Sequence, residues 1–259
     1  PNNYNSPLVD NLYRNKGDGT FEDATEISGI SKIFGNGLGI ACADYNNDGR
    51  SDVLMQRATP GDSFLLLADA SGRLMGISQT IGQAHVGLTW SKDQHTLLPG
   101  DLSGDGFDDL FFQAAEPAGT HGIPLANSSG LFTSSPTQTF TDASFPIFKW
   151  SRKHAVISTG DFNGDDKLDL LIQTKPSLVL IDYDIPIPVP VYPPNSFGIV
   201  YSQGGTTPLQ LAGVQQWNRL HNGVDWSPAS SVPIVGDFNG DGRDDVLLQL
   251  ARRVGPAIC

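Results

Sequence analysis

The 259-residue sequence has a formal net charge of −12, from 16 basic and 28 acidic side chains, and a pI near 4.6. Proteins that bind nucleic acids normally carry a basic surface, so this balance argues against a nucleic-acid partner. Hydrophobic residues make up 39% of the chain, with 29 glycines and 18 prolines, which favours short strands joined by turns over helix bundles. No run approaches the roughly 20 apolar residues of a membrane span. Two cysteines allow at most one internal bridge and exclude a disulfide scaffold.

The predicted elements are short apolar segments bounded by Gly and Asp, the usual signature of strands. At the N-terminus, residues 11–15 and 20–25 flank a turn at 16–19 and predict the last two strands of a sheet. The proline-rich segment 184–195 predicts a projecting loop or an edge, because proline cannot donate to a strand ladder. After the predicted strand 109–113 the strand pattern is less clear, with only 122–126 and a polar stretch at 127–144. The other predicted strands, in chain order, are 39–45, 52–56, 63–68, 73–78, 97–102, 109–113, 156–162, 169–173, 177–183, 197–202, 233–238 and 245–249.

Four aspartate-rich segments repeat along the chain in one register. They read DYNNDGRSDVLMQ, DLSGDGFDDLFFQ, DFNGDDKLDLLIQ and DFNGDGRDDVLLQ, and their starts lie 57, 60 and 76 residues apart. A Trp-Ser pair precedes the last three segments by 11 residues, at Trp90, Trp150 and Trp226, where the first unit has Ile33. Four such coincidences identify an internal repeat.

Each repeat predicts about four strands in about 60 residues, which is typical of one blade of a β-propeller. We therefore predict an all-β fold, a β-propeller of four-stranded antiparallel blades with four blade equivalents. The predicted single domain covers 1–259, with repeat units near 33–89, 90–149, 150–225, and 226–259 plus 1–32. In this arrangement residues 11–25 complete the blade that the C-terminal strands begin, so that one blade is split between the termini and no sheet edge is exposed.

The aspartate segments follow the pattern D-x-[NS]-x-D-[GD]-x-x-D, which is typical of a calcium loop. Ca²⁺ takes six to eight oxygen ligands, and alternate positions of a tight loop can direct carboxylates and amides toward one point. An EF-hand is excluded, since the position of its bidentate Glu holds Met55, Phe112, Ile172 or Leu248. One such cluster alone could be a plain Asp-Gly turn, but four with the same spacing favour a metal.

The predicted ligands are the side chains at positions 1, 3, 5 and 9 of each loop and the backbone carbonyl at position 7. About four Ca²⁺ ions are expected, one per loop, and the departures at Ser103 and Asp166 predict weaker binding in loops two and three. The candidate residues are Asp44, Asn46, Asp48, Arg50 and Asp52; Asp101, Ser103, Asp105, Phe107 and Asp109; Asp161, Asn163, Asp165, Lys167 and Asp169; and Asp237, Asn239, Asp241, Arg243 and Asp245.

These loops resemble the calcium loops of FG-GAP/VCBS repeats, the blades of integrin-α-like β-propellers. The wording GNGLGIACADYNNDGRSD and LYRNKGDGTFEDAT carries this resemblance, while WS…GDFNGDGRDDVLLQ is similar to propellers of bacterial toxin-complex and Rhs-type secreted proteins. The family implies rings of seven or sometimes six blades. With four blade equivalents, either the ring is small or the chain is incomplete.

Other recurring residues have simpler interpretations. The Trp-Ser pairs could stack on sugars, but recurrence at one register favours packing between blades. The repeated glutamines Gln56, Gln113, Gln173 and Gln249 are expected to satisfy backbone groups at strand ends. The five histidines show no zinc-type spacing and are expected to be ordinary surface or loop residues.

Three functions remain open from the sequence. The first is a secreted or cell-surface binding module in which calcium stabilises the blades and the loops contact a protein or a glycan. The second is a structural or docking propeller within a larger toxin-complex or Rhs-like assembly. The third, an enzyme, is least favoured, because no nucleophile elbow, P-loop or dinucleotide motif is present and the aspartate pairs belong to the loops.

Overall fold

The computed structural model describes residues 11–28, 30, 39–57, 62–74, 76–134, 136–181 and 187–250. The predicted segment 73–78 and the C-terminal continuation beyond residue 250 therefore lie partly outside the described residues. No helix in the described ranges is long and apolar enough to span a membrane. The chain divides into two compact units, which are described separately: unit 1 holds 1–100, 106–112 and 123–136, and unit 2 holds 101–105, 113–122 and 137–259.

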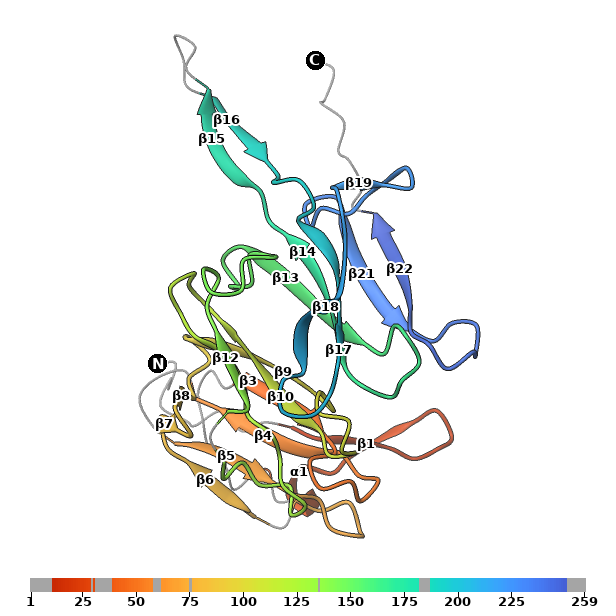
Figure 1. Ribbon diagram of the computed structural model, residues 1–259. Helices are drawn as coiled ribbons and strands as arrows, with labels where there is room; N and C mark the ends of the chain where they lie inside the picture. The colour runs from red at the N-terminus through yellow and green to blue at the C-terminus, as the bar shows by residue number, and fades with distance from the viewer. Residues whose placement is uncertain are drawn as a thin grey trace, which may run out of the picture. The chain divides into compact units, whose positions relative to one another are not determined.

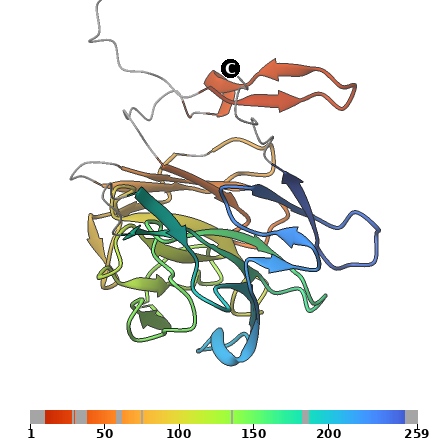
Figure 2. The same ribbon diagram turned by 90° about the horizontal axis from the view of Figure 1, so that it is seen from above.

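Unit 1 contains a hairpin, one helical turn and a four-stranded antiparallel sheet. The hairpin of β1 (Tyr13–Asn15) and β2 (Phe21–Asp23), visible in Figure 2, is followed by α1 (Thr25–Ser28). The sheet has the order β3-β4-β5-β6, formed by β3 (Gly39–Ala43), β4 (Asp52–Gln56), β5 (Ser63–Leu66) and β6 (Gln79–Ile81). A two-residue ladder of β7 (Ala84–His85) and β8 (Leu88–Thr89) follows.

The second repeat forms another four-stranded sheet, in the order β9-β10-β11-β12. Its strands are β9 (His95–Gly100), β10 (Asp109–Ala114), β11 (His121–Ile123) and β12 (Gln138–Phe140). The division between the two units runs through β10 and β11. The fully buried β10 reads DLFFQA, as expected for a central strand.

Unit 2 contains the third four-stranded sheet and the start of a fourth. The third has the order β13-β14-β17-β18, formed by β13 (Ala155–Gly160), β14 (Asp169–Thr174), β17 (Phe197–Ser202) and β18 (Leu209–Trp217). After the short ladder of β19 (Leu220–His221) and β20 (Val224–Asp225), β21 (Ser231–Gly236) pairs with β22 (Asp245–Leu250).

A two-stranded ribbon extends away from the β13-β14-β17-β18 sheet (Figure 1). It consists of β15 (Ser177–Ile181) and β16 (Ile187–Val191), inserted between β14 and β17. Residues 184–186 lie outside the described residues. For the remainder of the predicted segment 184–195 the edge is confirmed, since among the described strands β16 pairs only with β15. The assignment of 177–183 to the blade is wrong: β17 is the third strand of the sheet, with Leu170 opposite Val200.

Two other strand predictions need correction. The segment 73–78 contains no strand among its described residues, only an isolated bridge between Ala68 and Leu74, and the fourth strand of that sheet is β6. The nine-residue strand β18 was not predicted, because Gly213 and polar residues interrupt its alternation of apolar and polar residues. The predicted first and second strands of all four repeats are confirmed.

An apolar surface of the β21–β22 hairpin is exposed. Val232, Ile234 and Leu247 project from one face, Ile234 lying opposite Leu247, and Phe238 follows in the loop; their exposed fractions are 43–59%. We call these four residues the open face. In the third sheet Leu171, which occupies the register position of Leu247, is fully buried. The open face therefore lacks, within the described residues, the cover that its counterpart has.

Candidate metal site: the aspartate loops

Each aspartate loop connects the first two strands of a sheet. The first aspartate directly follows the first strand, and the ninth-position aspartate begins the second, as Asp44 and Asp52 do between β3 and β4. The same arrangement holds in the other three loops, between β9 and β10, β13 and β14, and β21 and β22. The repeat therefore places all the predicted side-chain ligands at hairpin ends.

The first aspartate closes its own loop by accepting backbone N–H groups. In loop four, Asp237 Oδ1 accepts from Gly240 at 2.6 Å and from Asp241 at 3.2 Å, and Oδ2 accepts from Gly242 at 2.9 Å. The hydrogen bond from Gly242 is the main cause that lowers the pKa of Asp237, since it favours the carboxylate. Asp161 makes the matching contacts in loop three.

The third position adds a second oxygen beside the first. Asn239 Oδ1 accepts the N–H of Asp241 at 2.8 Å, the same N–H that Asp237 accepts. Loops one and three repeat this through Asn46 and Asn163. Loop two differs, because Ser103 Oγ instead donates to Asp101 Oδ1 at 3.3 Å.

Basic side chains at position 7 contact the fifth-position aspartate in two loops. Arg50 Nη2 lies 2.6 Å from Asp48 Oδ2, and Lys167 Nζ lies 2.7 Å from Asp165 Oδ2. Burial on its own would raise the pKa of Asp165, but the hydrogen bonds from Lys167 and Asn163 outweigh it and lower the pKa. In these loops an internal cation already neutralises part of the charge that Ca²⁺ would meet.

The ninth-position aspartates of loops one to three are buried, and they connect the loop to the rest of its sheet. Asp169 Oδ2 accepts the N–H of Phe162 at 3.0 Å, and Oδ1 accepts the N–H of Ser202, at the end of β17, at 2.8 Å. Asp52 does the same with Tyr45 and Ala68. Burial raises the pKa of Asp169 to about 7. The sequence predicted only a metal ligand here, and it contained no signal for this bracing role.

The oxygen donors of the loops are of the chemical type that a hard cation prefers. Carboxylate and amide oxygens at positions 1 and 3 converge on one backbone N–H, and such oxygen-only groups are what Ca²⁺ prefers. Within the described ranges, no group of three or more His, Cys, Asp or Glu side chains is arranged to hold a metal ion. The calcium ligands predicted from the sequence therefore stay predictions.

At position 6, loop three has a non-glycine residue in the left-handed conformation, where the other loops have glycine. Asp166 has φ of +61°, whereas Gly49, Gly106 and Gly242 occupy this position with φ between +81° and +88°. We expect Asp166→Gly to raise the free energy of unfolding by about 0.5–1 kcal/mol, because glycine adopts the left-handed conformation without the Cβ penalty. Urea unfolding measures the change. The reverse substitution, Gly242→Asp, should lower stability by a similar amount; equal stabilities for all three proteins would contradict the prediction.

Two of the recurring tryptophans are packing residues, as expected. Trp90 and Trp150 are fully buried, and each indole N–H donates to a backbone carbonyl, that of His85 or Phe145. Gln113 Nε2 in turn donates to the carbonyl oxygen of Trp150 at 2.9 Å. Gln173 makes the same bond to Trp226, at 2.8 Å, which confirms the predicted role of these two glutamines.

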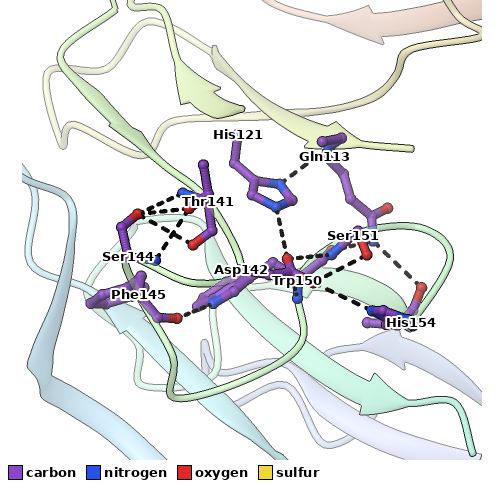
Figure 3. A network of polar contacts seen from close by, with 11 residues as sticks. Gln113, His121, Thr141, Asp142, Ser144, Phe145, Trp150, Ser151 and His154 are labelled. Atoms are coloured by element: carbon purple, nitrogen blue, oxygen red, sulfur yellow. Dashed lines mark hydrogen bonds and ion pairs between the residues drawn. The ribbon is translucent and has the colours of Figure 1, made fainter. Parts of the chain in front are cut away.

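A buried polar network in unit 2 was not foreseen (Figure 3). Asp142, 5% exposed, accepts hydrogen bonds from the backbone N–H groups of Trp150 and Ser151, both at 3.0 Å, and lies 3.1 Å from His121 Nε2. The N–H of Ala114 donates to His121 Nδ1, so Nε2 carries the proton that Asp142 accepts. The expectation that every histidine is an ordinary surface or loop residue is wrong for His121, which is fully buried, and for His95, which is buried at the start of β9.

Asp142 predicts a pH dependence of stability. Burial alone would raise its pKa, but the hydrogen bonds from His121, Ser151 and His154 outweigh it and lower the pKa. A carboxyl with a lowered folded-state pKa stabilises the fold fully above its unfolded pKa of about 3.9, and this contribution is lost as pH falls through the folded value.

We therefore expect Asp142→Asn to lower the free energy of unfolding at pH 7 by about 1–3 kcal/mol, because buried donors lose their acceptor. The variant should also lose less stability than the parent between pH 5 and 3, as measured by urea unfolding at each pH. Glu116→Gln, which removes only an exposed ion pair with Lys153, is the control. Parallel pH profiles for parent and Asp142→Asn would contradict this role.

One segment of the chain is similar to a known repeat family. Residues 3–55 match the FG-GAP-like repeat. The matched segment includes the whole of loop one, from Asp44 to Asp52. Cartilage acidic protein 1 of Xenopus tropicalis is 42% identical over 63 residues, which cover 24% of this chain and 10% of that protein. The human protein is 44% identical over 43 residues, 17% of this chain and 6% of its own length. The chain thus spans a tenth or less of the length of these relatives.

Solved structures give the fold class. A lectin of Agrocybe aegerita, described as specific for non-reducing terminal N-acetylglucosamine, has a TM-score of 0.58 at 16% identity, covering 91% of this chain and 54% of its own. The exotype rhamnogalacturonan lyase YesX has a TM-score of 0.42 at 11% identity, over 93% of this chain and 41% of its own. At such identity the likeness to the lectin shows the fold alone: an all-β protein of antiparallel sheets, like a propeller.

Proposed function

We propose that this chain is a calcium-stabilised binding module whose blade loops recognise a protein or a carbohydrate. The observation that carries the proposal is the shared geometry of loops one, three and four, where the oxygens at positions 1 and 3 accept one backbone N–H. Because these oxygens lie side by side in the folded loop, binding of a metal ion needs little rearrangement. Calcium would supply positive charge that joins the loop carboxylates, with no reaction attached to it.

The number and arrangement of the blades are also part of the proposal. We infer a β-propeller with four blade equivalents in one domain, in which residues 11–25 and the C-terminal strands share a blade. The supporting observation is the edge of β22: among the described strands it pairs only with β21, and Asp245 is partly exposed where Asp52, Asp109 and Asp169 are buried. A third strand is the element that would complete this sheet.

Calcium sites at exposed loops suit a secreted or cell-surface protein, where calcium is at millimolar level, and we place this chain there. The propeller-like fold shared with a lectin supports a carbohydrate as one class of ligand. Binding rather than catalysis is favoured because the aspartates of the loops are engaged in loop closure and strand bracing.

Isothermal titration of EDTA-treated protein with calcium tests the metal, and a glycan array with and without EDTA tests the ligand. We expect about four bound ions, with loops two and three weaker because of Ser103 and Asp166, and glycan or protein binding that is lost in EDTA. Absence of calcium binding at millimolar concentration would overturn the proposed function.

The open face supports a second candidate, a docking propeller within a larger secreted assembly of the toxin-complex or Rhs-like type. Its four residues are apolar and exposed, and they lie on the side that, in the third sheet, packs against the next hairpin. Analytical ultracentrifugation distinguishes the two. Docking would be favoured if the chain self-associates and Leu247→Asp abolishes this self-association, while Leu211→Asp, at another exposed leucine, leaves it intact.

A further inference from the structure

The aspartate loops contact one another through a residue outside the predicted ligand set. In unit 1 the N–H of Asp44 donates to Asp108 Oδ2 at 2.8 Å, and the N–H of Asp108 donates to the carbonyl oxygen of Asp44 at 3.2 Å. Asp44 is position 1 of loop one, and Asp108 is position 8 of loop two. The two residues, 64 apart in sequence, therefore form a reciprocal pair of hydrogen bonds.

The same pair recurs in unit 2 between loops three and four. The N–H of Asp161 donates to Asp244 Oδ2 at 2.9 Å, and the N–H of Asp244 donates to the carbonyl oxygen of Asp161 at 2.7 Å. Gly160 lies close to this contact: a Cβ there would lie 2.6 Å from Val235 Cγ1 and 2.7 Å from Asp244 Oδ2. The matching residue before Asp44 is Ala43, so the pair also forms beside a Cβ. Two independent occurrences with the same atoms indicate a built contact.

The chain contains its own comparison for the role of the side chain. In loop three, position 8 is Leu168, whose N–H donates to the carbonyl oxygen of Asp101 at 2.7 Å. The backbone half of the contact thus forms without a carboxylate. The carboxylate of Asp108 or Asp244 adds the second half, by fixing the N–H of the first residue in the preceding loop.

That first residue also organises its own loop. Asp161 accepts the N–H groups of Gly164 and Asp166 with its carboxylate while Asp244 holds its backbone N–H. A rotation of the Asp161 backbone would move the carboxylate that closes loop three. The position-8 aspartate therefore acts on the geometry of a loop to which it does not belong.

We propose that Asp108 and Asp244 are positioning residues that couple the loops in two pairs, one with two and three with four. Each raises the calcium affinity of the preceding loop by fixing its first ligand, an inference that rests on the proposed calcium binding. The calcium affinity of one loop then depends on its contact with the neighbouring loop, because an ordered loop presents its oxygens at a smaller entropic cost.

Calcium titration of the ¹⁵N-labelled chain, followed by NMR, tests the coupling loop by loop. The amide signals of Gly164 and Asp165 report loop three, and those of Asp48 and Gly49 report loop one. We expect Asp244→Leu, which copies the natural Leu168, to weaken the affinity read at loop three about tenfold and to leave loop one unchanged. Asp108→Leu should do the reverse.

Asp244→Asn separates geometry from charge and guards against a variant that does not fold. Its amide oxygen can still accept the N–H of Asp161, so it should keep most of the affinity if hydrogen bonding positions the loop. A loss as large as that of the leucine variant would assign the effect to charge and overturn the positioning role. If Asp244→Leu unfolds, the asparagine variant is compared with the parent, and a loss of about tenfold at loop three would overturn the positioning role.

Hydrogen exchange without calcium provides a readout that does not depend on the metal. The amide of Asp161 should exchange about tenfold faster in Asp244→Leu than in the parent, while the asparagine variant keeps its protection. Unchanged exchange and unchanged loop-three affinity in Asp244→Leu would overturn the coupling. If the parent binds no calcium, the proposed function fails, and the exchange rates still test the contact itself.

Discussion

Removal of calcium by EDTA is expected to lower the melting temperature of this protein by at least about 10 °C. A ligand that binds only the folded state stabilises it by about 2.7 kcal/mol per site at a hundredfold excess over Kd. For a domain of this size each kcal/mol of stability corresponds to roughly 2–4 °C of melting temperature. Loss of calcium from several sites therefore lowers the melting temperature by more than about 10 °C. Differential scanning calorimetry with and without 1–5 mM calcium measures it.

Single substitutions assign this effect to the loops. Asp237→Ala removes the first ligand of loop four and should abolish part of the calcium-dependent shift. Asp69→Ala is a matched control, since Asp69 also accepts backbone N–H groups in a turn but lies outside the repeat motif. Magnesium should restore little of the stability, because it demands a tighter octahedral arrangement. A melting temperature that EDTA leaves unchanged would mean that the loops are ordinary turns.

Truncation of the buried tryptophans is expected to produce the second large effect. Trp90 is fully buried and packs against Phe112 at 4.8 Å and Phe132 at 5.6 Å between ring centroids. We expect Trp90→Ala to cost about 3–5 kcal/mol of unfolding free energy, the usual range for a large aromatic removed from a core. The melting temperature should fall by about 10 °C or more.

The position of each tryptophan provides the control. Trp226 is only partly buried and contacts Trp217 at 4.9 Å, so Trp226→Ala should cost clearly less than Trp90→Ala. Trp90→Phe should recover about half of the loss by refilling part of the volume. If instead Trp90→Ala abolished glycan binding while leaving the urea midpoint unchanged, the residue would be a ligand contact and the packing interpretation would be wrong.

The sequence by itself determined the local features of this protein. Asp237 closes its loop on residues no more than five positions away, so the spacing of the motif contains everything needed to predict the hairpin. The flanking strands follow for the same reason, since β21 and β22 pair directly across that loop. The left-handed strain at Asp166 is equally visible, because the other three loops have glycine there.

Tertiary structure decided the contacts between residues far apart in the chain. The apolar segments at 177–183 and 197–202 are equally good strands by pattern. Only the second forms the sheet, because its end brings the Ser202 N–H to Asp169, 33 residues away. The contact between Asp44 and Asp108 and the burial of His121 beside Asp142 arise in the same way. Such partners depend on how intervening segments of unequal length fold back, and residue spacing along the chain does not encode that.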